Sequence, residues 1–236
     1  MFGVFDGHGG VECARYIKKH LPSLLCERMG SQEPRDALRS AFLATDRNFI
    51  EQVTILDDDA GSTCVVALIQ SGTLYVAHAG DSRAILRRQG GAQRLTIDHK
   101  PGRVDECERV ARCGGRVVRG RVNGVLAVSR AFGNKHLKSC VTAEPEILKV
   151  DLQKGDDYLI LASDGLWDVV SDQVALQLVD AQCKQGKGLK EAAEVLTSQA
   201  IELGSRDNIT VIVVDVCDWH VERHGRSPPG SPFAMD

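Results

Sequence analysis

Four aspartates stand at the ends of apolar, strand-like runs, and together they could bind metal ions. Asp6 follows FGVF, Asp164 follows YLILAS, Asp207 precedes NITVIVVDV, and Asp81 separates LYVAHAG from SRAILRR. For a single aspartate an ordinary surface turn is the simpler interpretation, because Asp-Gly and Asp-Asn are common turn dipeptides. Strands of one core can, however, bring their ends together. Carboxylates crowded there repel each other unless a cation lies among them.

The ligand types favour a hard divalent cation, Mg²⁺ or Mn²⁺. Carboxylates, backbone carbonyls and water are the groups that such ions prefer. A carboxylate shared by two ions would hold them about 3.5–4 Å apart, which is the geometry that activates a water for in-line attack on phosphorus. We expect Asp6 to be this shared ligand. Gly7 has no side chain to keep its backbone away from an ion, so its carbonyl is a further candidate.

His8 lies two residues after Asp6, between two glycines. A lone histidine is more often structural than catalytic. Beside a metal site, however, it could act as a general acid and protonate a departing alkoxide. The residues alone leave both interpretations open.

The composition excludes several classes of protein. The chain has 236 residues and a formal net charge of −3, so no basic balance points to nucleic acid, and a two-metal nuclease is disfavoured. The longest apolar runs fall short of the ~18 residues of a membrane span, and we see no signal peptide. The eight cysteines form no CxxC pair, which favours reduced thiols over disulfides or zinc. We therefore expect an intracellular protein, cytoplasmic or nuclear.

The order of predicted elements indicates an α+β fold. Helices are expected at the ranges with helical spacing of apolar residues, and strands at the β-branched runs. The order is helices, a block of strands, further helices and a last strand, which indicates antiparallel sheets with helices packed outside. The predicted helices are 11–25, 34–53, 104–115, 171–183 with Ser171 as N-cap, and 189–204; the strands are a three-stranded meander within 61–88, one in 156–165 that runs into a turn, and one over 207–217.

Six motifs resemble those of one family. VFDGHGG, AGDSRA, DHKP, RVNGVLAVSRAFG, ASDGLWDV and SRDNITVIVV, in this order and at these distances, are similar to the protein phosphatase 2C family of metal-dependent serine/threonine phosphatases. The resemblance runs from about residue 2 to residue 216. It implies an antiparallel β-sandwich flanked by α-helices, a four-layer α-β-β-α arrangement, with two Mn²⁺ or Mg²⁺ ions at one end. We expect residues 1–217 to form this domain and residues 218–236 to be a disordered tail.

The resemblance also implies roles for individual residues. It places Asp6 at the bridging metal ligand, Gly7 at a carbonyl ligand, and Asp164 and Asp207 at carboxylate ligands. His8 falls on the family's general acid. Asp81 and Asp168 fall on positions that some members use for a weaker third ion.

Other residues in or near the motifs are expected to be structural. We expect Trp167 to be a core residue and Arg130 to support the fold rather than bind substrate. Asn134 stands where many family members have Asp, which leaves the contacts of its loop open. The acidic run 57–59 before Gly61 is expected to be a solvated loop.

One family motif is absent from these residues. Family members carry R-x-x-M-E-D on a strand before VFDGHGG; its Arg holds the substrate phosphate and its acidic pair helps to hold a metal. The string occurs nowhere in the 236 residues, and RVDE at 103–106 lies in a predicted helix. We therefore expect a domain without the family's first strand segment, with weakened phosphate binding and unpaired sheet edges.

The predicted function is hydrolysis of phosphoserine and phosphothreonine in proteins by a metal-activated water. The expected partners are phosphorylated protein substrates, without nucleic acid or membrane, and the chain is expected to be a monomer. The alternative is a shortened phosphatase-like protein that is weakly active or inactive and acts by binding partners.

Overall fold

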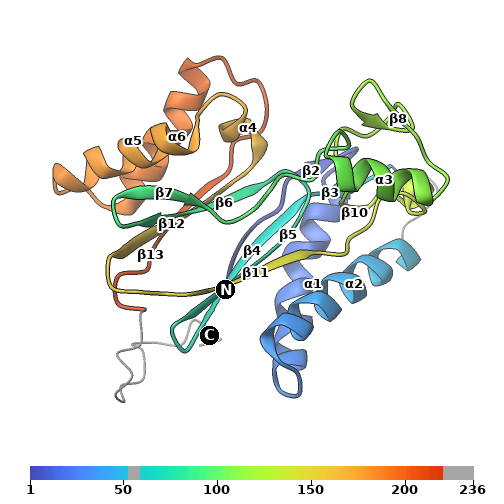
Figure 1. Ribbon diagram of the computed structural model, residues 1–236, viewed down its shortest axis with the longest axis horizontal. Helices are drawn as coiled ribbons and strands as arrows, with labels where there is room; N and C mark the ends of the chain where they lie inside the picture. The colour runs from blue at the N-terminus through green and yellow to red at the C-terminus, as the bar shows by residue number, and fades with distance from the viewer. Residues whose placement is uncertain (53–58, 220–236) are drawn as a thin grey trace.

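Two antiparallel β-sheets stack face to face, and helices cover both outer faces (Figure 1). The computed structural model describes residues 1–52 and 59–219. Acidic positions 57 and 58, and all of the predicted tail except Asp218 and Trp219, lie outside the described residues. The four-layer α-β-β-α arrangement expected from the sequence is confirmed.

Each sheet has four strands. The first has the order β1-β4-β5-β11 and the second the order β13-β12-β6-β7, with every neighbouring pair antiparallel. The strands of the first sheet are β1 (Phe2–Val4), β4 (Cys64–Gln70), β5 (Thr73–Ala79) and β11 (Glu146–Asp151); those of the second are β13 (Val211–Asp215), β12 (Asp156–Ala162), β6 (Arg83–Arg88) and β7 (Gly91–Arg94).

Burial explains why the central strands are apolar without alternation. In β4, Val65 and Ala67 pack between the two sheets, whereas Val66 and Leu68 pack under the helices on the outer face. Successive side chains of a strand point to opposite faces, so a strand that is covered on both faces needs apolar residues at every position.

The helices form one layer on each side. Figure 1 shows α1 and α2 over the first sheet, and α5 and α6 over the second. No helix among the described residues is long and apolar enough to cross a membrane. The helices are α1 (Glu12–Met29), α2 (Pro34–Gln52), α3 (Val104–Arg112), α4 (Asp164–Trp167), α5 (Asp172–Lys184) and α6 (Leu189–Glu202), with a 3-10 turn at Lys135–Leu137.

Among the described residues, the five long helices lie where the sequence predicts them, but α1 is longer than predicted, α3 ends at Arg112 instead of 115, and the short helix α4 replaces a predicted turn. The hydroxyl of Ser171 caps α5 by accepting a hydrogen bond from the Val174 N–H at 3.3 Å, as predicted. Helix α1 runs through Pro22 to Met29, four residues beyond the predicted end. Leu21 and Leu25 on either side of the proline are buried, and their burial outweighs the hydrogen bond that the proline removes.

The predicted meander within 61–88 is wrong in its third strand. Strands β4 and β5 pair, but β6 crosses to the second sheet. The chain turns at Gly80, whose φ of +113° and close approach to Thr63 leave no room for a side chain. The crossing places Asp81 between the two sheets.

Short strands close the end of the sandwich. Strands β10, β3 and β2 form a small sheet, and β8 and β9 form a hairpin that projects beyond α3 (Figure 1). Their bounds are β2 (Gly7–His8), β3 (Gly61–Ser62), β10 (Phe132–Gly133), β8 (Val117–Val118) and β9 (Arg121–Val122).

Candidate functional site

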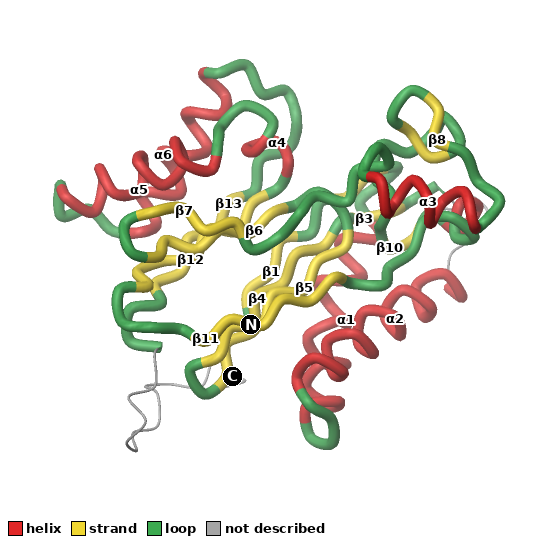
Figure 2. The backbone as a smooth tube through the Cα atoms, in the orientation of Figure 1, coloured by secondary structure: helices red, strands yellow, loops and turns green. Residues whose placement is uncertain are grey.

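Four aspartates line one pocket of about 210 Å³ at the end of the sandwich. Asp6 follows β1, Asp81 lies at the crossing from β5 to β6, Asp164 begins α4 and is separated by one residue from the end of β12, and Asp207 lies in the loop before β13. Figure 2 shows these loops at the end of the sandwich where β3 and α4 lie. Gly7 and His8 line the same pocket. The structure therefore brings together six of the seven predicted site residues.

The pKa values of two of these aspartates are raised, because they are buried close to other negative charges. Burial, together with the negative charges of Asp81 and Asp6, raises the pKa of Asp164 to about 7. Burial and the charges of Asp207 and Asp81 raise the pKa of Asp6 to about 6. Both shifts arise because the carboxylates are held near one another away from water.

Asp164 also has an oxygen without a partner. Its Oδ1 is buried and has no hydrogen-bond partner among the described residues. A buried carboxylate oxygen is costly unless it is hydrogen-bonded or bound to a cation. A divalent cation among these aspartates would satisfy this oxygen and offset the repulsion, so the residues present fit a metal site.

Lys100, which the sequence reasoning did not select, is the cation nearest to these aspartates in the described part of the chain. Its ammonium donates a hydrogen bond to Oδ2 of Asp81 and lies 3.9 Å from Oδ2 of Asp164. Lys100 belongs to the motif DHKP, so the sequence did contain a signal by which this residue could have been found. Asp168, the seventh predicted site residue, is exposed outside the pocket lining, although its charge contributes to the raised pKa of Asp164.

His8 is held by Asn134. Its Nε2 lies 2.8 Å from Oδ1 of Asn134, and the Asn134 amide nitrogen donates to the Asp59 carbonyl at 2.9 Å. The second bond fixes which end of the amide faces His8, so Nε2 of His8 carries the hydrogen. A Cβ at Gly61 would lie 2.2 Å from the Asn134 oxygen and 2.3 Å from His8 Nε2. Only glycine fits there.

The loop that carries Asn134 is tied to α2. The buried carboxylate of Asp46 accepts hydrogen bonds from the Gly133 N–H at 2.8 Å and from the Lys138 ammonium at 2.9 Å. Asn134 itself has a φ of +50°, a conformation that Asn tolerates better than most residues. The sequence left the contacts of this loop open because they depend on residues far away in the chain.

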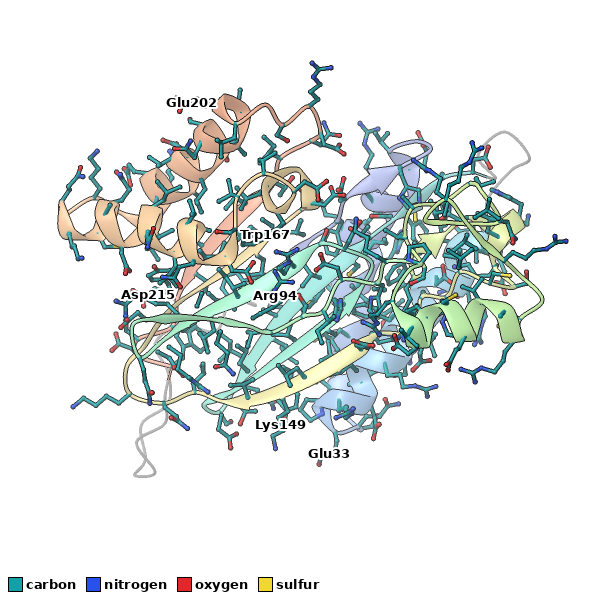
Figure 3. All side chains as sticks on the ribbon, turned by 45° about the horizontal axis from the view of Figure 1, so that its top comes forward. Glu33, Arg94, Lys149, Trp167, Glu202 and Asp215 are labelled. Atoms are coloured by element: carbon teal, nitrogen blue, oxygen red, sulfur yellow. The ribbon has the colours of Figure 1, made fainter. Side chains whose placement is uncertain are left out.

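Arg130 and Trp167 are structural, as predicted. The Arg130 guanidinium binds Oε1 of buried Glu106 at 2.7 and 3.0 Å, outside the pocket lining. Trp167 is labelled in Figure 3, where the α5–α6 layer meets the second sheet, and its indole N–H donates to the Ala162 carbonyl at 2.9 Å.

A second group of metal-ligand residues lies away from the pocket. His78, His99 and Glu146 each offer an atom within 4.8 Å of the others, the only such group of three among the described residues. The aspartates of the pocket are more widely spaced as a group.

The hydrogen bonds of this second group argue against a metal. Nδ1 of His99 accepts a hydrogen bond from the Gly80 N–H at 3.1 Å, so the ring's hydrogen is on Nε2, which faces Glu146 at 3.4 Å. A protonated nitrogen cannot coordinate an ion. The Glu146 carboxylate is also bound by the Arg103 guanidinium. Glu146 therefore has a structural role: it contacts His99 and Arg103 and is not a metal ligand.

Comparison with known proteins assigns the chain to a family. The family model described as "Protein phosphatase 2C" matches residues 1–209. The chain belongs to the protein phosphatase 2C family. The family resemblance inferred from the six motifs is confirmed, and with it membership of a family of metal-dependent protein phosphatases.

Curated relatives from plants support this assignment. "Probable protein phosphatase 2C 7" of Oryza sativa subsp. japonica is 43% identical over 218 residues, covering 91% of this chain and 57% of the relative. "Probable protein phosphatase 2C 69" of Arabidopsis thaliana is also 43% identical, covering 91% of this chain and 60% of the relative. The chain thus spans somewhat over half the length of these two phosphatase 2C relatives.

Solved structures of similar fold extend the comparison. A serine-threonine phosphatase 2C from Toxoplasma gondii superposes with a TM-score of 0.79 at 26% identity, covering 91% of this chain and 84% of that chain. A C. elegans sex determining protein superposes with a TM-score of 0.85 at 32% identity, covering 91% of this chain and 55% of that chain. This member of the phosphatase 2C family therefore has the expected fold.

Proposed function

We propose that this protein is a phosphoprotein phosphatase that hydrolyses phosphoserine and phosphothreonine with Mn²⁺ or Mg²⁺. One observation carries the proposal: aspartates line a pocket that also holds His8, the pKa values of Asp6 and Asp164 are raised, and a buried oxygen of Asp164 has no hydrogen-bond partner among the described residues. Such a site is suited to divalent cations and to a phosphoryl group beside them.

The residues of the pocket have separate roles in this proposal. Asp6 would be shared by two ions, with Asp164, Asp207 and the Gly7 carbonyl as further ligands. Bound divalent cations would supply a Lewis acid and a water activated for attack on phosphorus. Asp81 would hold a weaker third ion only by exchanging its hydrogen bond with Lys100 for the ion, and Asp168 would contribute from outside the pocket.

His8 would supply the proton for the leaving group. Because its Nε2 is engaged by Asn134, the hydrogen delivered to the seryl or threonyl oxygen would come from Nδ1. An alkoxide is a poor leaving group, so proton donation in the transition state lowers the barrier.

The size of the pocket supports a phosphoryl group on a side chain as the bound group. Its volume of about 210 Å³ is below the roughly 300–1,000 Å³ of sites that enclose a small molecule. The apolar residues Leu126, Ala127 and Val128 form part of the wall. A phosphorylated side chain could enter while the rest of its protein stays outside.

Turnover with and without metal tests the proposal. Hydrolysis of p-nitrophenyl phosphate and of a phosphothreonine peptide should require added Mn²⁺ or Mg²⁺ and stop with a chelator. Mn²⁺ binding by calorimetry without any turnover would instead support the alternative of a phosphatase-like binding protein. Monomeric state, an intracellular location and a domain boundary at residue 217 stay predictions; light scattering would test the first.

A further inference from the structure

One arginine points to how the pocket binds an anion. Arg121 is the only cationic residue that lines the aspartate pocket in the described part of the chain. It comes from β9, on the hairpin that projects over this end of the sandwich (Figure 1). Its position opposite four aspartates needs an explanation, because it forms no ion pair with any of them.

The backbone turns tightly on both sides of the strand that carries Arg121. Left-handed pairs at 119–120, with φ of 51° and 73°, and at 123–124, with φ of 51° and 76°, enclose a strand of only two residues. Two consecutive left-handed residues are typical of tight type I′ turns. Val122 of the same strand is fully buried in the cluster under α3. Because adjacent strand residues point to opposite sides, the side chain of Arg121 points away from this buried cluster, and it lines the pocket.

Most of the hydrogen-bonding capacity of Arg121 is unused. Its Nη1 donates to the Val125 carbonyl at 2.7 Å, and no carboxylate among the described residues pairs with it. Other arginines of the chain are paired, for example Arg83 with Asp98 and Asp172, and Arg130 with Glu106. A guanidinium offers several N–H donors in a planar fork that matches two oxygens of a phosphoryl group.

We propose that Arg121 is a substrate-binding residue that holds two oxygens of the phosphoryl group in the pocket. This inference rests on the proposed function and deepens it. According to this inference, the hairpin contacts the phosphoryl group of the substrate directly, through Arg121. The competing interpretations are that Arg121 only offsets the charge of the aspartates, or that it only closes the hairpin through Val125.

Three substitutions separate these interpretations. Arg121→Ala removes the fork and the charge, Arg121→Lys keeps the charge without the fork, and Arg116→Ala is the control. Arg116 is an exposed arginine of the same hairpin region that does not line the pocket. Equal thermal unfolding midpoints in all variants would show that the fold is kept.

The first measurement is binding of inorganic phosphate to the full chain with saturating Mn²⁺, by calorimetry. Charge-assisted hydrogen bonds are worth enough that Arg121→Ala should weaken phosphate binding by roughly 10- to 100-fold. Arg121→Lys should lie between this variant and the unchanged protein. Arg116→Ala should stay within about twofold. The same ranking is expected for KM with a phosphothreonine peptide.

The outcomes distinguish this inference from the proposed function. If Arg121→Ala changes phosphate affinity and KM no more than Arg116→Ala, the inference is overturned while Mn²⁺-dependent turnover still supports a phosphatase. If Arg121→Lys matches the unchanged protein, the role is charge alone and the two-oxygen contact is overturned. If phosphate binding depends on Arg121 but nothing is hydrolysed, the contact stands and the proposed activity fails.

Discussion

Nε2 of His8 lies 2.8 Å from Oδ1 of Asn134, and the same amide donates to the Asp59 carbonyl. Asn134 therefore joins the candidate general acid to the segment that precedes β3. Because the amide is held at both ends, it fixes both the position of the imidazole and the nitrogen that keeps its hydrogen. Asn134 is thus a positioning residue for His8.

Replacing Asn134 should impair catalysis without unfolding the protein. Asn134→Gly removes the amide, and glycine accepts the positive φ at this position without strain. We expect kcat with a phosphothreonine peptide to fall by roughly 10-fold, because the imidazole is no longer oriented. Mn²⁺ affinity, measured by calorimetry, should stay unchanged. An equal loss in Mn²⁺ affinity would contradict a role confined to His8.

His8 itself should matter most when the leaving group is poor. Only a basic alkoxide needs a proton in the transition state, whereas p-nitrophenolate leaves without one. His8→Ala should therefore lower kcat with the phosphothreonine peptide by about 10²- to 10⁴-fold and with p-nitrophenyl phosphate much less. Parallel kinetics on the two substrates measure the ratio. Equal losses would show that His8 is structural.

Replacing an aspartate of the pocket should weaken metal binding, and for Asp164 it should also stabilise the metal-free protein. Asp6→Asn, Asp164→Asn and Asp207→Asn should each weaken Mn²⁺ binding in calorimetry, because each removes a charged ligand. With a chelator at pH 8, Asp164→Asn should raise the free energy of unfolding by on the order of 2 kcal/mol, since it removes a buried, repelled charge.

The matched control for this pair of effects is Asp105→Asn. Asp105 is an exposed aspartate that lies outside the pocket and is bound by Arg103. It should change neither Mn²⁺ affinity nor the difference in stability with and without metal. If all three pocket variants bind Mn²⁺ as the unchanged protein does, the metal site is wrongly assigned.

The sequence predicted the layers of the fold better than the contacts of the site. Helical spacing and strand-like runs are local signals, which is why α2 and the cap at Ser171 were found. The crossing of β6 to the second sheet was missed, because a strand-like run does not reveal which sheet the strand joins. The pairing of Lys100 with Asp81, and the place of Arg121 above the pocket, depend on how distant segments fold together, which no local pattern encodes.

The buried pair His78 and His99 should make stability depend on pH. The rings stack at 4.3 Å, and His99 is fully buried. Burial lowers the pKa of His99 to about 4, and the neighbouring His78 and Arg130 act in the same direction, against the opposing effect of Glu146. The folded protein therefore resists protonation of His99, whereas the unfolded chain takes up the proton near the ordinary value of 6.5.

The sign of the effect follows from that difference. Above pH 6.5 neither state protonates His99 and its contribution to stability is complete; it is lost as the pH falls from 6.5 towards 4. At about 1.4 kcal/mol per pKa unit, the loss is on the order of 3 kcal/mol. His99→Asn keeps an acceptor for the Gly80 N–H and cannot titrate, so its free energy of unfolding should fall less over this range. Denaturant unfolding between pH 4 and pH 7 measures both proteins. Parallel pH profiles would mean that His99 is not the group responsible.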